Sequence, residues 1–279
     1  MSRQEYKYQN FLITHTMEEC GPHPTIPHDH YDDSFCITII LDGTGTCYVE
    51  GIACPLSAGT IMVLSPDEMR FFQLSQTGRH ERITLYFSKS IVTSLWDYDL
   101  SLLEGFIAKP ALIGNWFTPD HYDEQVVQPI ISRLQAVFAS EVLMKEARLH
   151  ILILQLLFAL CDSRKTQAVM PPVQEQDQAI QDICAYIKTH LNEDLSHSFF
   201  QKNFFVSHHV LTKRFPLQTG MTLSKYITTK RLMMAVSLIR DGLGFENAAF
   251  KAGFNSYCHF YKEFVKHFGQ SPRKHFKDK

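Results

Sequence analysis

The chain has 279 residues, of which 45% are hydrophobic and 20% are charged. This length is typical of one or two domains, and the composition excludes the disordered and fibrous classes. The longest apolar run, residues 151–160, is too short to cross a bilayer, which takes about 20 apolar residues. The N-terminal residues lack the apolar core of a signal peptide, so the sequence predicts a cytoplasmic protein with no membrane partner.

The charge of the chain is divided unequally along its length. Residues 1–179 carry 12 Lys and Arg against 22 Asp and Glu, whereas residues 180–279 carry 15 against 7. The first part therefore has a formal charge of −10 and the second a formal charge of +8. An acidic part joined to a basic part indicates that only the second part meets a polyanion such as DNA.

Short apolar segments separated by Gly and Pro turns fill the first 90 residues. Predicted strands cover residues 35–41, 46–50, 60–64 and 83–87. The turn at residues 42–45 joins the first two strands, and this arrangement is the signal of a β-hairpin. Short strands at this spacing predict a small antiparallel barrel or sandwich.

The hydrophobic period becomes helical from about residue 122. One helix is predicted over residues 126–138 and a second over residues 141–161, which is apolar on more than one side. A helix that is apolar nearly all round must bury more than one face, either against the barrel or against a second copy of the chain. The candidate dimerisation residues on the second helix are Leu149, Leu152, Leu156 and Leu160.

A polar stretch at residues 162–178 contains a Pro-Pro pair and predicts a linker. We therefore expect an α+β protein of two domains. Residues 1–161 form an antiparallel β-barrel with following helices, and residues 179–279 form an all-α domain.

Two stretches of the C-terminal domain have the form helix, short turn, helix, at residues 195–215 and 246–264. This pattern is the signature of the helix-turn-helix motif. The helix between them, residues 223–240, is about 27 Å long at 1.5 Å per residue. Successive major grooves on one face of B-DNA repeat every ~34 Å, so two units on one chain can reach two adjacent grooves of double-stranded DNA.

The residues of this region resemble the AraC/XylS family of transcription regulators. The resemblance covers about residues 180–276. It is carried by Thr219, Gly220, Lys225, Tyr226, Ile227, Lys230, Arg231, Leu232, Ala235, Leu238, Ile239, Ala248, Ala249, Ala252, Gly253, Phe254, Phe260, Phe264, Gly269, Ser271 and Pro272. It implies a sequence-specific DNA-binding regulator, more often an activator, with RNA polymerase as a further partner.

The resemblance also implies which residues contact DNA. The second helix of each unit would lie in the major groove, over residues 207–215 and 256–267. The positions that match the family's base contacts are His209, Thr212 and Lys213 in the first unit, and Tyr257, Cys258, Tyr261 and Lys262 in the second. Side chains near the start of a recognition helix reach base edges, and Lys can donate to guanine.

The first unit departs from the family pattern at three positions. Gln201 replaces a small residue, Phe205 replaces a turn glycine and Pro216 replaces a basic residue. Proline removes a backbone donor and clashes with the preceding turn, so we expect the first recognition helix to end or kink early. We therefore expect the first unit to contribute less to base readout than the second.

The N-terminal half resembles the cupin-like barrel with which many family members sense a small molecule and form homodimers. His28 and His30 would point to one side of a strand, because side chains alternate. Cys36 and Arg70 occupy the remaining metal-ligand positions of a cupin, and Arg70 would repel a cation. We expect His28, His30 and Arg70 to bind an anionic or polyhydroxylated effector, because Arg offers five fixed donors and no acceptor.

No motif of an independent enzyme is present. The chain has seven cysteines, an odd number, and no Cys-x-x-Cys pair. The sequence therefore indicates neither a zinc ribbon nor a disulfide framework. Phosphate-binding loops, nucleophile elbows and His-Glu-x-x-His helices are also missing. We therefore expect neither a cofactor nor a metal. Two alternatives stay open: a cupin-type metalloenzyme fused to a DNA-binding domain, and a ligand-independent DNA-binding regulator that uses the barrel only to dimerise.

Overall fold

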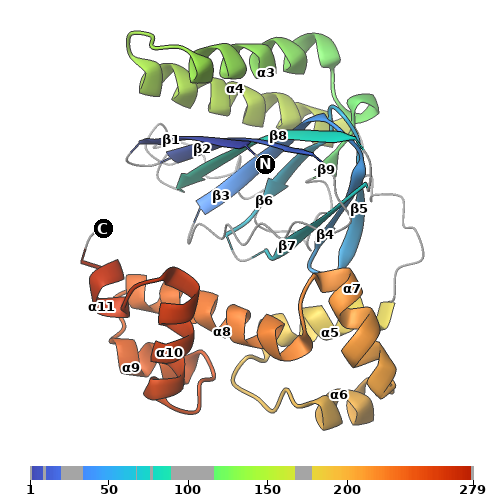
Figure 1. Ribbon diagram of the computed structural model, residues 1–279, viewed down its shortest axis with the longest axis vertical. Coiled ribbons are helices and arrows are strands. Elements are labelled where there is room, and N and C mark those ends of the chain that lie inside the picture. Colours follow the sequence, from blue (N-terminus) through green and yellow to red (C-terminus); the bar gives the residue numbers. More distant parts are fainter. Residues whose placement is uncertain are drawn as a thin grey trace. The chain divides into compact units, whose positions relative to one another are not determined.

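The computed structural model of the protein describes residues 2–8, 11–19, 34–66, 68–75, 78–88, 116–166 and 178–277 (Figure 1). The chain divides into two compact units, Met1–Gln174 and Glu175–Lys279. The first unit contains two β-sheets and two long helices, and the second is helical throughout its described residues. Among the described residues, no helix is long and apolar enough to cross a membrane.

Two antiparallel sheets build the first unit. The larger has the strand order β1-β2-β8-β3-β6-β9, and the smaller has the order β5-β4-β7. The strands are β1 (Ser2–Tyr8), β2 (Phe11–Glu19), β3 (Ser34–Asp42), β4 (Gly45–Val49), β5 (Ile52–Leu56), β6 (Ile61–Leu64), β7 (Arg70–Leu74), β8 (Arg79–Ser88) and β9 (Trp116–Phe117).

The predicted hairpin between the first two apolar segments is wrong. β3 pairs with β6 and β8, while β4 pairs with β5 and β7, so the connection between them passes from one sheet to the other. The physical reason is that β3 is buried on both faces and lies inside its sheet, where both of its edges are already paired. Gly43 allows the crossing, because its φ is +97° and a Cβ there would lie 2.6 Å from the carbonyl oxygen of Arg79.

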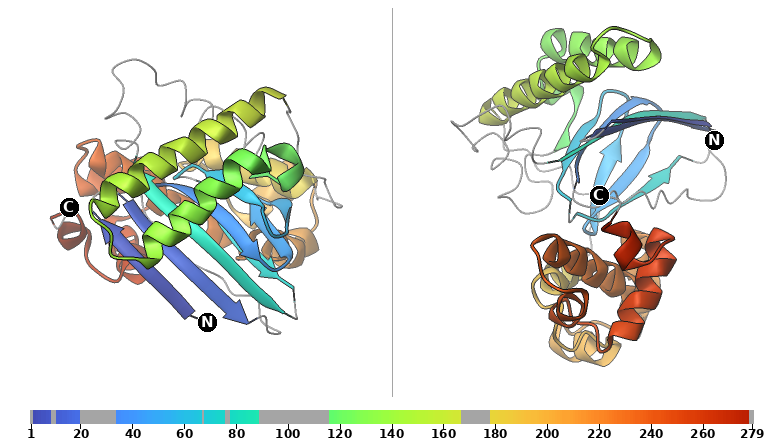
Figure 2. Two further views of the ribbon diagram at one scale, coloured as in Figure 1. Left: turned by 90° about the horizontal axis from the view of Figure 1, so that it is seen from above. Right: turned by 90° about the vertical axis from the view of Figure 1, so that its left-hand side faces the viewer.

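Helices α3 (Glu124–Ala139) and α4 (Lys145–Thr166) cover one face of the larger sheet (Figures 1 and 2). Ile37, Ile39 and Leu85, at odd-numbered positions of β3 and β8, point to this face and lie in one core with the helices. α4 differs from its predicted bounds. It begins after Met144, which has a positive φ, and it continues past residue 161.

The leucines that were candidates for dimerisation lie inside the first unit. Leu149, Leu152, Leu156 and Leu160 are all buried in the core between the helices and the sheet. In the structure these four side chains therefore pack within their own domain, and their role in a dimer stays a prediction. Ile151 lies on the other side of α4 and is 56% exposed.

The second unit begins with α5 (Gln178–Thr189) and contains two short helix pairs that flank a long central helix. Its further helical elements are α6 (His197–Asn203), a π-helical turn (Val210–Arg214), α7 (Phe215–Thr219), α8 (Leu223–Arg240), α9 (Phe245–Lys251), α10 (Tyr257–Phe268) and α11 (Pro272–His275). Ser196, Thr222 and Ser256 cap α6, α8 and α10, because each hydroxyl accepts a hydrogen bond from a backbone N–H of the first turn.

The position of the leucines predicts a stability effect. We expect Leu156→Ala to lower the free energy of unfolding by about 2–5 kcal/mol, because it leaves a cavity in a closely packed core. Ile151→Ala, on the exposed side of the same helix, is the matched control and should cost less than about 1 kcal/mol. Chemical denaturation of both variants measures the difference. Equal losses would contradict the assignment of the two faces.

Candidate DNA interface and effector site

The second helix-turn-helix unit consists of α9, a turn at residues 252–255 and α10. Phe260 and Phe264 are fully buried against α8 and α9, and they fix one face of α10 in the core. Cys258, Tyr261 and Lys262 are exposed on the opposite face. The structure therefore brings three of the four predicted contact residues together on one outward surface.

Tyr257, the fourth predicted contact of this unit, is placed differently. It is half-buried, and its ring lies 5.7 Å from that of Phe260 and 6.3 Å from that of Tyr261. Burial raises the pKa of its phenol above the ordinary value. Its ring packs beside the core, so Tyr257 contributes less to the outward face than the other three predicted residues.

The first unit consists of α6, a turn at residues 204–207 and a helical segment from His208 to Thr219. His209 and Lys213 are exposed, while Thr212 is half-buried. The Thr212 hydroxyl donates to the carbonyl oxygen of His208 at 2.9 Å, within its own helix. His209 and Lys213 are thus the two predicted residues of this unit whose side chains face outward.

The structure interrupts the regular α-helix before Pro216, as one of the two predicted outcomes requires, but it does not end the helix there. The chain continues through Pro216 to Thr219, because the preceding turn widens to π-helical geometry. There the N–H of Phe215 donates to the carbonyl oxygen of Val210, five residues earlier. A wider turn accommodates a proline that lacks an N–H and whose ring would press on the carbonyl of Thr212 in an α-helix.

Phe205 in the turn of the first unit has a strained backbone. Its φ is +54°, in the left-handed region that favours glycine, and its side chain is 92% exposed. A non-glycine residue in this region costs roughly 1–2 kcal/mol. Since the ring is almost fully exposed, little packing within the second unit offsets this cost.

This strain gives a direct prediction. Phe205→Gly should raise the free energy of unfolding by about 1 kcal/mol, because glycine adopts a positive φ without steric cost. Phe205→Ala is the control, since it removes the ring but keeps the Cβ that causes the strain. Thermal or chemical denaturation distinguishes the two. A gain that is the same for both variants would show that the exposed ring, and not the backbone, limits stability.

The interior of the first unit is unexpectedly polar. This interior lies between the two sheets. Side chains at even-numbered positions of β2, β3 and β8 pack there against side chains of the smaller sheet. Arg82 on β8 forms a buried ion pair with Glu18 on β2, with Nη1 and Oε1 2.7 Å apart. The Arg82 guanidinium also lies 4.9 Å from the centre of the Phe72 ring on the opposite sheet.

His80 lies beside this ion pair and is fully buried. Its Nδ1 is 3.4 Å from Nη1 of Arg82, and its Nε2 has no hydrogen-bond partner among the described residues. Burial, and next the charge of Arg82, lower the pKa of His80 from 6.5 to about 4, so the ring is neutral at neutral pH.

Of the three predicted effector residues, the structure describes Arg70 alone. Its Nη2 donates to the Tyr86 hydroxyl at 2.9 Å, and the guanidinium lies 5.5 Å from the centre of the same ring. Arg70 on β7 and Tyr86 on β8 thereby join the two sheets across the interior. His28 and His30 lie outside the described residues.

Sequence reasoning missed Glu18, His80 and Arg82. Cross-strand pairing places Glu18 opposite His80, and Thr16 opposite Arg82, on one face of the sheet. The available signal was the alternation of polar and apolar residues along both strands. Alternation of this kind normally marks a solvated face, but here the polar face points to the interior.

A basic helical unit with two helix-turn-helix pairs, joined to a β-sheet unit with a polar interior, defines a DNA-binding transcription regulator controlled by a small molecule. The family model described as an AraC-like ligand binding domain matches residues 17–157, which is half of the chain. A helix-turn-helix domain model matches residues 202–278. The chain belongs to the AraC family, and the resemblance and the two-domain fold class that the sequence predicted are both confirmed.

Several known proteins are similar over most of the chain. The HTH-type transcriptional activator RhaS of Escherichia fergusonii is 26% identical over 246 residues, which cover 88% of this chain and 86% of that protein. RhaS of Escherichia coli is 22% identical over the same share of both chains. Among solved structures, ToxT of Vibrio cholerae is 15% identical with a TM-score of 0.43, covering 96% of this chain and 97% of that one.

The buried histidine predicts how stability depends on pH. Between pH 6.5 and pH 4 the unfolded state binds a proton at His80 that the folded state lacks, so stability falls as the pH falls. We expect His80→Gln to flatten this dependence by up to about 1.4 kcal/mol per pH unit. Chemical denaturation across this pH range gives the slope. An unchanged slope would mean that His80 titrates normally in the folded protein.

Proposed function

We propose that this protein activates transcription as a homodimer, in which each protomer places two recognition helices in successive major grooves. The observation that carries the proposal is the outward row of Cys258, Tyr261 and Lys262 on α10, opposite the buried Phe260 and Phe264. A helix held in this way presents a constant polar face to a groove. The excess of 15 Lys and Arg over 7 Asp and Glu in residues 180–279 supports attraction to phosphate groups.

The two units contribute unequally in this proposal. The π-helical turn carries Lys213 itself, and the turn before it is strained at Phe205. Lys262 lies in a regular α-helix that is capped by Ser256. In this proposal the second unit therefore presents its base-reading side chains from a more regular helix than the first unit does.

The test of DNA readout compares Lys262→Ala with Lys213→Ala on a duplex selected by the wild-type protein from random DNA. Lys262→Ala should weaken binding by roughly 1–3 kcal/mol and relax the sequence preference at one position. Lys213→Ala should cost less. Titrations on single-base variants of the duplex give both quantities. A uniform loss over all sequences would identify a phosphate contact, and a larger loss at Lys213 would reverse the ranking.

We further propose that the effector is anionic or polyhydroxylated and binds between the two sheets. The half-buried Arg70 and the buried Arg82 both reach this interior from opposite sheets, and His80 lies beside Arg82. Guanidinium and imidazole donors suit carboxylate or hydroxyl groups better than a cation. In this proposal the first unit senses a ligand and does not catalyse a reaction. The dimer bound at a promoter then contacts RNA polymerase.

Calorimetry with candidate carboxylates and sugars tests the effector proposal. Arg70→Ala should weaken the binding of the true effector by at least about tenfold, because a charge-assisted contact contributes about 1.5–3 kcal/mol. Arg79→Ala, an exposed arginine of β8, is the control and should leave binding unchanged. Metal analysis of the purified protein tests the enzyme alternative. Stoichiometric metal that is lost on His28→Ala would contradict the metal-free sensor.

A further inference from the structure

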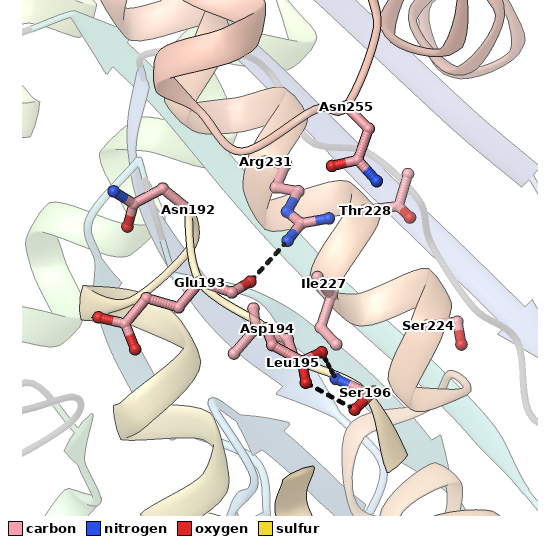
Figure 3. Close-up of a pocket in the computed structure, with 10 residues that line it drawn as sticks. All are labelled: Asn192, Glu193, Asp194, Leu195, Ser196, Ser224, Ile227, Thr228, Arg231 and Asn255. Atoms are coloured by element: carbon pink, nitrogen blue, oxygen red, sulfur yellow. Dashed lines mark hydrogen bonds between the residues drawn. The ribbon is translucent and has the colours of Figure 1, made fainter. Parts of the chain in front are cut away.

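Three segments that are distant in the sequence meet at the middle of α8 (Figure 3). They are the turn that follows α5, the central helix itself and the turn between α9 and α10. Arg231 on α8 connects the first two. Its Nε donates to the carbonyl oxygen of Leu191 at 2.9 Å, and its Nη2 lies 3.4 Å from the carbonyl oxygen of Glu193.

Gly253 brings the turn of the second helix-turn-helix unit to the same place. Its φ is +92°, and a Cβ there would lie 2.0 Å from the carbonyl oxygen of Leu191 and 2.9 Å from Nε of Arg231. Only glycine therefore permits this approach. The carbonyl of Leu191, at the entrance to the first unit, thus lies between Arg231 and the turn of the second unit.

The surrounding packing is open. A cavity of about 490 Å³ lies between the segment from Asn192 to Ser196 and the Ser224 and Thr228 side of α8 (Figure 3). The guanidinium bridges these two walls, with its two donors on two carbonyl groups. Arg231 is half-buried, and this partial burial lowers the pKa of its guanidinium.

We propose that Arg231 is a positioning residue that fixes the separation of the two recognition helices, and that it thereby sets the spacing between the two DNA contacts that the protein accepts. The inference rests on the proposed function, in which both helices enter DNA. When two binding elements are held rigidly, the first contact presents the second at a high effective concentration, but only at the matching distance. A loose connection lowers that concentration and accepts other distances.

The fork geometry explains why arginine is needed here. A guanidinium holds two acceptors in one plane at fixed angles, whereas a lysine ammonium is a single flexible donor group. Arg231→Lys should therefore keep the charge but lose part of the positioning. Arg231→Ala should lose all of it. Arg240→Ala removes the same charge from the C-terminal end of the same helix and serves as the matched control.

The experiment uses the full-length protein and a duplex selected by the wild type, with its two contact regions mapped by footprinting. One base pair is then inserted between the two regions. We expect the wild type to bind the lengthened duplex about tenfold more weakly, and Arg231→Ala to reduce that penalty to about twofold while binding the parent duplex about tenfold more weakly. Duplexes that carry only one contact region should bind the wild type and the variant equally.

Each other outcome is decisive. Arg231→Ala could weaken binding to single-contact duplexes by the same factor as binding to the parent duplex, and keep the full penalty for the inserted base pair. Arg231 would then only stabilise the fold, and the inference would be wrong. The inference would also be wrong if Arg231→Lys showed the same tenfold penalty for the inserted base pair as the wild type, because the positive charge alone would then suffice. If Arg231→Ala does not fold, the partial loss expected of Arg231→Lys carries the test. A wild type that is indifferent to the inserted base pair would refute the two-groove function itself.

Discussion

Burial of both faces of β3 and β8 is the constraint on which the first unit depends. Ile37, Ile39 and Leu85 on one face attach α3 and α4, so the opposite face has to close against the smaller sheet. That closure takes Arg82 and Glu18 out of water, and their ion pair is then required to compensate for the lost hydration. The alternation of side chains along β3 and β8 thus produces both the core under the two helices and the polar interior between the two sheets.

In the second unit α8 has the corresponding role, because both helix-turn-helix pairs pack against this one helix. Tyr226 contacts the first pair through Phe215, while Leu232 and Ala235 lie in one core with Phe260 and Phe264 of the second. The two recognition surfaces are therefore parts of one helical body. Under the proposed function, selectivity for DNA then depends on the distance between these surfaces as well as on the side chains that they present.

How far the sequence predicts the structure differs between the two units. The helical period predicts the DNA-binding unit well, because helices such as α5 and α10 bury one stripe of their surface. The sheet unit is less predictable, since local sequence does not determine which strands pair or which side of a strand faces water. Arg82 is an example of a polar side chain that faces the interior and not water. The leucines of α4 show that a helix that is apolar on several sides can bury them within its own domain.

The π-helical turn before Pro216 has a consequence for comparing this chain with its relatives. Such a turn is equivalent to one extra residue in an α-helix, and each added residue rotates the remainder of the helix by about 100° around its axis. Against a relative whose helix is a regular α-helix here, an alignment without a gap therefore assigns Leu217 and its successors to the wrong side of the helix.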